Sequence, residues 1–258
     1  MQIVLAALAG GAVGFTLGLV GGGGSILAVP LMVYLVGVHD PHVAIGTSAL
    51  AVAANALIGL TTHARKHNVK WRCAAAFATA GVVGAWFGAT LGKTMDGQKL
   101  LALFALLMLA VAGMMVRSRG RGGDPSVMFN GSNAPKLLGS GAATGLPSGF
   151  FGIGGGFLVV PGLIASTGMP ILFAVGSSLV AVSAFGLTTA VSYASSGLVA
   201  WSLAGIFIGG GAVGSLLGAR LATRLAHRNG LLNLVLAGLI VVVALYMLLR
   251  AASAFGWL

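Results

Sequence analysis

Two clusters of glycine are the part of this sequence best suited to bind a ligand. The stretch GGGGSILAVP begins at Gly21, and the similar stretch GIGGGFLVVP begins at Gly152. Glycine lets a chain leave helical geometry and lets a ligand approach the backbone, and free backbone N–H groups bind anions. We therefore expect an anion site here, with close helix packing as the alternative. The candidate binding residues in the clusters are Gly23, Gly24, Ser25, Gly155 and Gly156.

Each cluster is followed by a triplet that carries hydroxyl groups. The triplets are Gly46-Thr47-Ser48 and Gly176-Ser177-Ser178, each near the start of a long apolar segment. A hydroxyl at a helix start can accept hydrogen bonds from the first free N–H groups and so cap the helix. The same position offers hydroxyl donors and the positive end of the helix dipole to an anion. We favour the anion site and keep capping as the alternative, so Thr47, Ser48, Ser177 and Ser178 join the candidate substrate-binding residues.

The composition places these residues in a membrane. The chain has 258 residues, of which 58% are hydrophobic and 7% are charged. A soluble domain carries roughly a quarter charged residues, and a spanning helix needs about 20 mostly apolar residues. An all-α integral membrane protein is therefore expected. Its predicted hydrophobic segments are 3–20, 26–37, 43–62, 73–92, 99–116, 137–151, 156–168, 171–193, 202–222 and 231–250.

The segments fall into two similar halves. Pro30 matches Pro161 at an offset of 131 (161 − 30), and after a gap of one residue Trp71 matches Trp201 at an offset of 130 (201 − 71). The glycine clusters, the hydroxyl triplets and a later glycine-spaced segment recur in the same order. We predict an N-terminal repeat at 1–116, a linker at 117–135 and a C-terminal repeat at 136–258, each repeat with about five hydrophobic segments.

Two further features bear on the site. Asn55 is polar within an apolar segment, while the matching Phe185 is not. Asn55 either bonds across helices or lines a substrate path, so it is included in the candidate site. The second segment of each half covers roughly 18 to 20 Å, which is less than the roughly 30 Å hydrocarbon core. Together with the helix-breaking prolines Pro30 and Pro161, this predicts broken or re-entrant helices at the glycine clusters.

Basic residues predict the orientation of the halves. The loop 63–72 carries Arg65, Lys66, Lys70 and Arg72, whereas the matching loop 193–201 carries no charge. Cytoplasmic loops are enriched in Lys and Arg, so the two loops belong on opposite sides. With loop 63–72 and the basic linker 117–135 in the cytoplasm, the repeats are inverted and both termini lie outside.

The groups that are scarce narrow the chemistry. The chain has 14 Lys and Arg but 3 acidic residues, Asp40, Asp96 and Asp124, all in expected loops. Cation carriers usually keep carboxylates in the membrane, so an anionic or neutral substrate fits better. His39, Asp40 and His42 are the groups available for proton coupling, with ordinary loop roles as the simpler explanation. The sequence has no metal-ligand spacing, phosphate loop or CxxC motif, so no enzyme, metal or cofactor is expected.

In the order of its duplicated motifs, the chain resembles the TauE/SafE family of sulfite and organosulfonate exporters. The motifs are GGGGSILAVP and GIGGGFLVVP, the two hydroxyl triplets, the matched tryptophans and the later glycine-rich helix. The resemblance covers nearly the whole chain, and the linker is its least typical part. It implies a permease of the cell membrane for small anions such as sulfite or a sulfonate.

The sequence therefore predicts a secondary permease for a small anion that works by alternating access between inverted repeats. A passive channel for a small anionic or neutral solute is the alternative, and a structural membrane protein without a site is a third hypothesis. The expected partners are the anion and the lipid bilayer, not nucleic acid. A homodimer stays open, because small residues serve helix packing and dimer formation alike.

Overall fold

The computed structural model describes residues 1–117, 133–154, 156–225 and 240–250, together with 124, 127, 129–131 and 238. In this part of the chain the secondary structure is helical and contains no strand. The main helices are α1 Gln2–Val20, α3 Pro41–Arg65, α4 Trp71–Thr94, α5 Gly97–Arg117, α6 Ala134–Phe151, α7 Gly156–Thr167, α8 Ile171–Ala194 and α9 Trp201–Leu225. A further apolar helix covers Ile240–Arg250.

Among the described residues, five stretches are long and apolar enough to cross a membrane. They are Gln2–Leu35, Pro41–Arg65, Trp71–Thr94, Ile171–Ala194 and Trp201–Leu221, and shorter apolar helices cover Gly97–Gly113, Gly156–Thr167 and Ile240–Arg250. The predicted all-α membrane class is confirmed, and the predicted segments match the described helices to within a few residues. Much of the predicted segment 231–250 and of the linker 117–135 lies outside the described residues.

The chain between α1 and α3 is irregular, as the first glycine cluster predicts. A 3₁₀ helix, η1, covers Gly21–Leu27, a single α-turn, α2, covers Ala28–Pro30, and a π-helix, η2, covers Leu31–Leu35. Gly21 has a φ of 69°, which favours glycine because it has no Cβ. Proline has no N–H to donate to the preceding turn, and the hydrogen bonding widens to the π pattern directly after Pro30. In the second half, α7 continues through Pro161 to Thr167.

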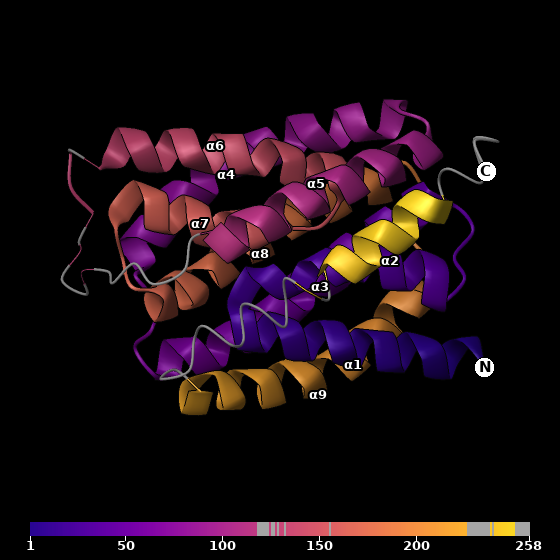
Figure 1. The fold of residues 1–258 in the computed structure, drawn as a ribbon, viewed down its shortest axis with the longest axis horizontal. Helices are drawn as coiled ribbons and strands as arrows, with labels where there is room; N and C mark the ends of the chain where they lie inside the picture. The colour runs from indigo at the N-terminus through magenta and orange to yellow at the C-terminus, as the bar shows by residue number, and fades with distance from the viewer. Residues whose placement is uncertain are drawn as a thin grey trace.

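The helices form two outer pairs with α3 and α8 between them (Figure 1). In one pair α1 packs along α9, and in the other α4 packs along α6. Glycines allow the backbones to touch, because a Cβ at Gly10, Gly14 or Gly18 of α1 would meet the backbone of Phe207, Gly211 or Ser215 of α9. The residue numbers rise together in the two helices, so α1 and α9 run parallel. The evenly spaced glycines of these two helices therefore serve helix packing.

The other pair repeats this packing at the matching positions. A Cβ at Gly141, Gly145 or Gly149 of α6 would meet the backbone of Phe77, Gly81 or Ala85 of α4. Each contact is the α1–α9 contact shifted by the repeat offset, with the halves exchanged: Gly14 and Gly211 become Gly145 and Gly81. The first long helix of each half thus packs on the fourth helix of the other half. The inversion of the repeats relative to the bilayer stays a prediction.

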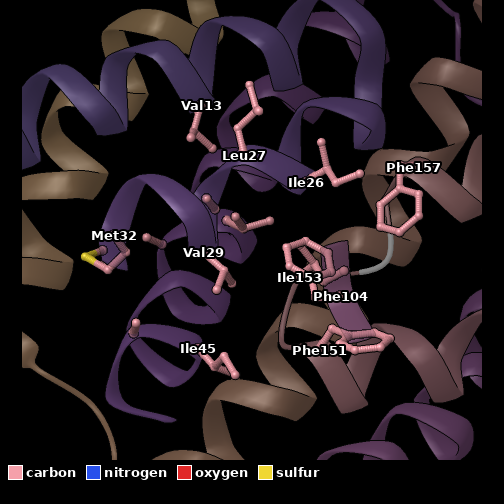
Figure 2. Packing of buried hydrophobic residues seen from close by; sticks show 14 of the residues in the cluster. Val13, Ile26, Leu27, Val29, Met32, Ile45, Phe104, Phe151, Ile153 and Phe157 are labelled. Atoms are coloured by element: carbon pink, nitrogen blue, oxygen red, sulfur yellow. The ribbon is translucent and has the colours of Figure 1, made fainter. Parts of the chain in front are cut away.

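The apolar core gathers where the irregular segments of the two halves meet. Figure 2 shows Ile26 and Leu27 of η1 in one cluster with Phe157 of α7 and with Phe151 and Ile153, which lie at and just after the end of α6. Phe104 of α5 closes this cluster, with its ring centroid 5.5 Å from that of Phe151. Both glycine clusters are therefore held inside packed apolar side chains.

Candidate functional site

Thr47 and Ser177 hold helix starts in the opposite half. The backbone N–H of Ala200, next to the start of α9, donates to Thr47 Oγ1 at 2.9 Å. The backbone N–H of Lys70, next to the start of α4, donates to Ser177 Oγ, also at 2.9 Å. These two bonds occupy matching positions of the repeat. Each hydroxyl therefore links the two halves through a hydrogen bond, and we call the hydroxyls of Thr47 and Ser177 the clamp hydroxyls.

The alternative in which the triplets cap their own helices is wrong. Helix α3 begins at Pro41, and the Asp40 carboxylate accepts from the backbone N–H groups of His42 at 2.8 Å and Val43 at 3.4 Å. Helix α8 begins at Ile171. The triplets therefore lie more than one turn inside their helices, where the helix uses the backbone N–H groups and only the hydroxyls can reach a partner.

Each glycine turn packs on the triplet region of the other half. The N–H of Gly22 donates to Ser178 Oγ at 3.2 Å, and that hydroxyl donates to the carbonyl of Val175 at 2.8 Å. Gly152, with a φ of 66°, packs against Ile45. Gly152 and Ile45 match Gly21 and Val175, so the turns and the triplet regions are brought together crosswise.

The two glycine clusters also touch directly. A Cβ on Gly22 would overlap the backbone of Gly156, and a Cβ on Gly156 would overlap that of Gly22. Ser25 is buried and donates from Oγ to the Gly22 carbonyl at 2.8 Å. Of the other candidates, Gly23 is buried in η1 and Gly24 packs back on Thr16 and Leu17 of α1. Gly155 lies outside the described residues.

Ser48 and Asn55 differ from the other candidates because their buried polar atoms have no partner. Both side chains are 0% exposed. Ser48 Oγ and both Asn55 amide atoms have no hydrogen bond with the described residues. The Asn55 amide lies directly against Gly211 of α9. Leaving a buried polar group unpaired costs about 1–3 kcal/mol, and a partner that hydrogen-bonded to these atoms would offset that cost.

His63 is a buried polar residue that the sequence analysis placed in a loop. Helix α3 runs on to Arg65, and His63 lies 0% exposed in its last turn. Its Nε2 is 3.4 Å from the carbonyl oxygen of Gly18 in α1, and its Nδ1 has no partner among the described residues. The spacing of eight residues from Asn55 could have indicated that His63 is buried, because positions eight apart lie near one another on one helix face.

Ser48, Asn55 and His63 form one polar stripe along α3. Positions 48, 55 and 63 are separated by about two helical turns each, so they share a face. At 1.5 Å per residue the stripe is roughly 22 Å long, a large part of the roughly 30 Å hydrocarbon core. Within the part of the chain that the structure describes, each of the three carries at least one unpaired polar atom.

The matching face of α8 has a different character. Ser178 Oγ is hydrogen-bonded, and Phe185 stands in place of Asn55, with its ring centroid 6.3 Å from that of Phe77. Tyr193 stands in place of His63 and is also buried. The three matching positions of α8 thus carry one bonded hydroxyl and two aromatic side chains, and the buried Tyr193 hydroxyl is also without a partner among the described residues.

Two of the three acidic side chains of the sequence are engaged at helix starts. Asp40 caps α3, and the Asp96 carboxylate accepts from the N–H groups of Gln98 and Lys99 at the start of α5. The described residues contain no group of three His, Cys, Asp or Glu side chains that could hold a metal ion. The interior therefore offers a ligand hydroxyl, amide, imidazole and backbone groups. Long apolar helices around buried glycine turns and this polar stripe define a multi-pass helical membrane protein.

Comparison with known proteins gives the family. The model of the sulfite exporter TauE/SafE family matches residues 6–247, so the chain belongs to this family of membrane transporters. A probable membrane transporter protein of Xylella fastidiosa is 50% identical over 245 residues, covering 94% of this chain and 93% of the relative.

More distant relatives carry the same description. One from Methanocaldococcus jannaschii is 29% identical over 190 residues, covering 70% of each chain. One from Bacillus subtilis is 26% identical over 248 residues, covering 88% of this chain and 90% of the relative. No solved structure matches the chain. The resemblance inferred from the duplicated motifs is confirmed.

Proposed function

We propose that this transporter carries a small anion, such as sulfite or an organosulfonate, and that Ser48 and Asn55 bind it. The observation that carries the proposal is that their buried polar atoms have no partner among the described residues. A serine hydroxyl and an amide NH₂ group both donate hydrogen bonds, which an anion needs in place of its hydration shell. The substrate class comes from the family description and from the absence of glutamate and the few aspartates in the sequence.

The glycine turns would form the other wall of the site. Gly22 and Gly156 are in contact, so in this arrangement the turns leave no room for a ligand between them. Separating them would free the Gly22 N–H from Ser178 and expose the N–H groups of Gly23 and Gly24. Backbone N–H groups of an interrupted helix then face the anion, as in other transporters with broken helices.

Thr47 and Ser177 have a different role in this proposal. Their hydroxyl oxygens accept from the backbone of the opposite half, so they hold the halves together instead of contacting the substrate. The alternating access predicted from the repeat would require one half to move against the other. The hydrogen bonds of Thr47 and Ser177 would then lie at the interface across which the two halves move.

The orientation proposed from the sequence keeps loop 63–72 and the linker 117–135 in the cytoplasm and both termini outside, in the cell membrane. The positions of Trp71 and Trp201 support placing the starts of α4 and α9 at opposite membrane–water interfaces. They begin α4 and α9 and are 54% and 66% exposed, and tryptophan is enriched where helices enter and leave the bilayer. Cysteine labelling from outside at the exposed Gln2 and at His67 tests this orientation: we expect Gln2→Cys to react and His67→Cys to be protected in intact cells.

Transport by the purified protein in liposomes tests the substrate and the site. We expect saturable uptake of radiolabelled sulfite or sulfoacetate, lost in Ser48→Ala and strongly reduced in Asn55→Leu. Ser183→Ala is the matched control, because Ser183 is buried in α8 but its Oγ donates to the Leu179 carbonyl at 2.7 Å. Unfolding temperatures should not fall in Asn55→Leu, since replacing an unpaired buried polar group by an apolar one costs little.

Three outcomes would overturn this proposal. Normal uptake in both site variants would remove Ser48 and Asn55 from the binding site. Absence of uptake for sulfite, sulfate, thiosulfate, sulfoacetate and short carboxylates would remove the small anion. Solute movement that never exceeds equilibrium, with a turnover far above about 10³ per second, would establish the passive channel instead of the permease.

A further inference from the structure

We infer that His63 binds the proton that couples anion transport to a pH gradient. This inference rests on the proposed transport function. Within the described part of the chain, His63 is the one histidine that is buried. Histidine is the side chain whose charge normally changes near neutral pH. The acidic residues Asp40 and Asp96 are engaged at helix starts, so they are poorly placed to carry a proton through the interior.

The position of His63 suits a group that exchanges protons between the site and one side of the membrane. It lies in the last turn of α3, two residues before the end of that helix. Its Nε2 faces the Gly18 carbonyl in α1, and Nδ1 has no partner among the described residues. An imidazole with one free nitrogen can take a proton from hydronium, leaving water, and return it to water later. No other reactant is needed.

The polar groups around His63 continue toward the anion site. Gly18 packs on the backbone of Ser215 in α9, and Ser215 Oγ is buried without a partner in the described chain. One turn earlier on α9, Gly211 lies against the Asn55 amide. The junction of α1, α3 and α9 therefore holds three side chains with unpaired polar atoms, His63, Ser215 and Asn55. Such groups can hold water or relay a proton in an otherwise apolar bundle.

The charges near His63 explain why its proton and the anion would move together. The end of α3 carries Arg65 and is followed by Lys66, α9 contributes Arg220, and the start of α4 contributes Lys70 and Arg72. Helix α1 and η1 contribute no titratable side chain, and the described titratable side chain of α5, Lys99, stands near its start. Among the described charged side chains, the cationic Lys66 acts on His63, and no described carboxylate is found to act on it. A bound anion would supply the missing negative charge, and binding of each partner would then favour the other.

The second half of the repeat lacks this device. Tyr193 replaces His63, and Phe185 replaces Asn55. A phenol does not gain positive charge, so the α8 side cannot carry a proton in the same way. The coupling is thus confined to one of two otherwise similar halves, which gives a duplicated protein a single proton site for each anion.

Transport under an imposed pH gradient tests the coupling. Liposomes containing the wild-type protein should accumulate labelled methanesulfonate, whose charge does not change with pH, and a trapped pH dye should report proton movement with it. We expect His63→Gln to abolish both gradient-driven accumulation and anion-dependent proton movement while exchange of labelled for unlabelled anion continues. His67→Gln, in the exposed loop after α3, is the matched control and should behave like the wild type. Equal gradient-driven accumulation in His63→Gln and the wild type would overturn the inference.

A second measurement does not depend on transport. In protein with ¹⁵N-labelled histidine in nanodiscs, the signal missing from His63→Gln identifies His63. We expect this signal to change reversibly with pH and methanesulfonate to increase its protonated fraction. An imidazole that stays neutral throughout the range in which the protein remains folded would overturn the proton role, whether or not transport is observed. Protonation of His63 without transport of any anion tested would instead retain the proton site and reject the proposed substrate.

Discussion

The side-chain amide of Asn55 in α3 lies directly against Gly211 of α9, with neither of its polar atoms hydrogen-bonded in the described chain. At the matching position of the other half, the ring of Phe185 lies against Gly81. Gly211 and Gly81 thus occupy matching positions, and each leaves space for a side chain from the central helix of the other half. The space at Gly211 is filled by the amide of Asn55, and the space at Gly81 is filled by the ring of Phe185. The packing is therefore the same in both places, but only one of them holds a polar group.

The Asn55–Gly211 contact predicts a compensating pair of substitutions. Gly211→Ala places a methyl group where the amide lies, and overpacking of this kind costs about 1–3 kcal/mol. Asn55→Ala in the same chain should restore most of the unfolding temperature in detergent. Gly14→Ala is the control, because its methyl would meet the Gly211 backbone, which Asn55→Ala cannot relieve. Failure of the pair to compensate would show that the amide is not held against Gly211.

The contact between the glycine turns predicts sensitivity at Gly22. A Cβ there would overlap the Gly156 backbone, so Gly22→Ala should lower the free energy of unfolding by about 1–3 kcal/mol and reduce transport. Gly205→Ala in α9 is the control, because a Cβ at that position meets no atom within 4 Å. It should be neutral or stabilising, as alanine is the better helix former. Thermal unfolding and uptake on the same preparations distinguish the two.

The clamp hydroxyls predict a loss of stability. Thr47→Val keeps the shape of the side chain but removes the acceptor of the Ala200 N–H, and Ser177→Ala does the same for Lys70. Each should lower the free energy of unfolding by about 1–2 kcal/mol, whereas Thr47→Ser should retain most of it. If Thr47→Val lowered the affinity for the anion and left stability unchanged, Thr47 would belong to the binding site as the sequence analysis expected.

The left-handed backbone conformation of His67 predicts that glycine at this position would stabilise the protein. It has a φ of 56°, and the matching residue in the other half is Gly197 with a φ of 73°. A non-glycine residue in this left-handed conformation costs about 1 kcal/mol, so His67→Gly should raise the free energy of unfolding by up to about 1 kcal/mol and leave transport unchanged. His67→Ala keeps the Cβ and should give no such gain. A lower unfolding temperature for His67→Gly would mean that the imidazole makes a stabilising contact.

Sequence reasoning found the helices because apolar length and glycine spacing depend on local chemistry. It also found the duplication, since matched residues such as Trp71 and Trp201 keep their register. It placed the start of α8 at residue 171, as observed, and that of α3 two residues after Pro41. It missed the burial of His63 because a basic sequence suggests a loop. The crossing of Thr47 to Ala200 depends on tertiary packing and could not be read from spacing within one half.

The pairing of α1 with α9 and of α4 with α6 has a consequence for biosynthesis. Helix α1 is synthesised before α9, so its glycine face has no partner until α9 has been made. Neither half can complete its helix packing without the other. We therefore expect the small-residue faces of the nascent N-terminal half to contact lipid or the insertion machinery until the second half has been made. Truncated chains that end before α9 should therefore be targets for membrane quality control, however many of their helices have been inserted.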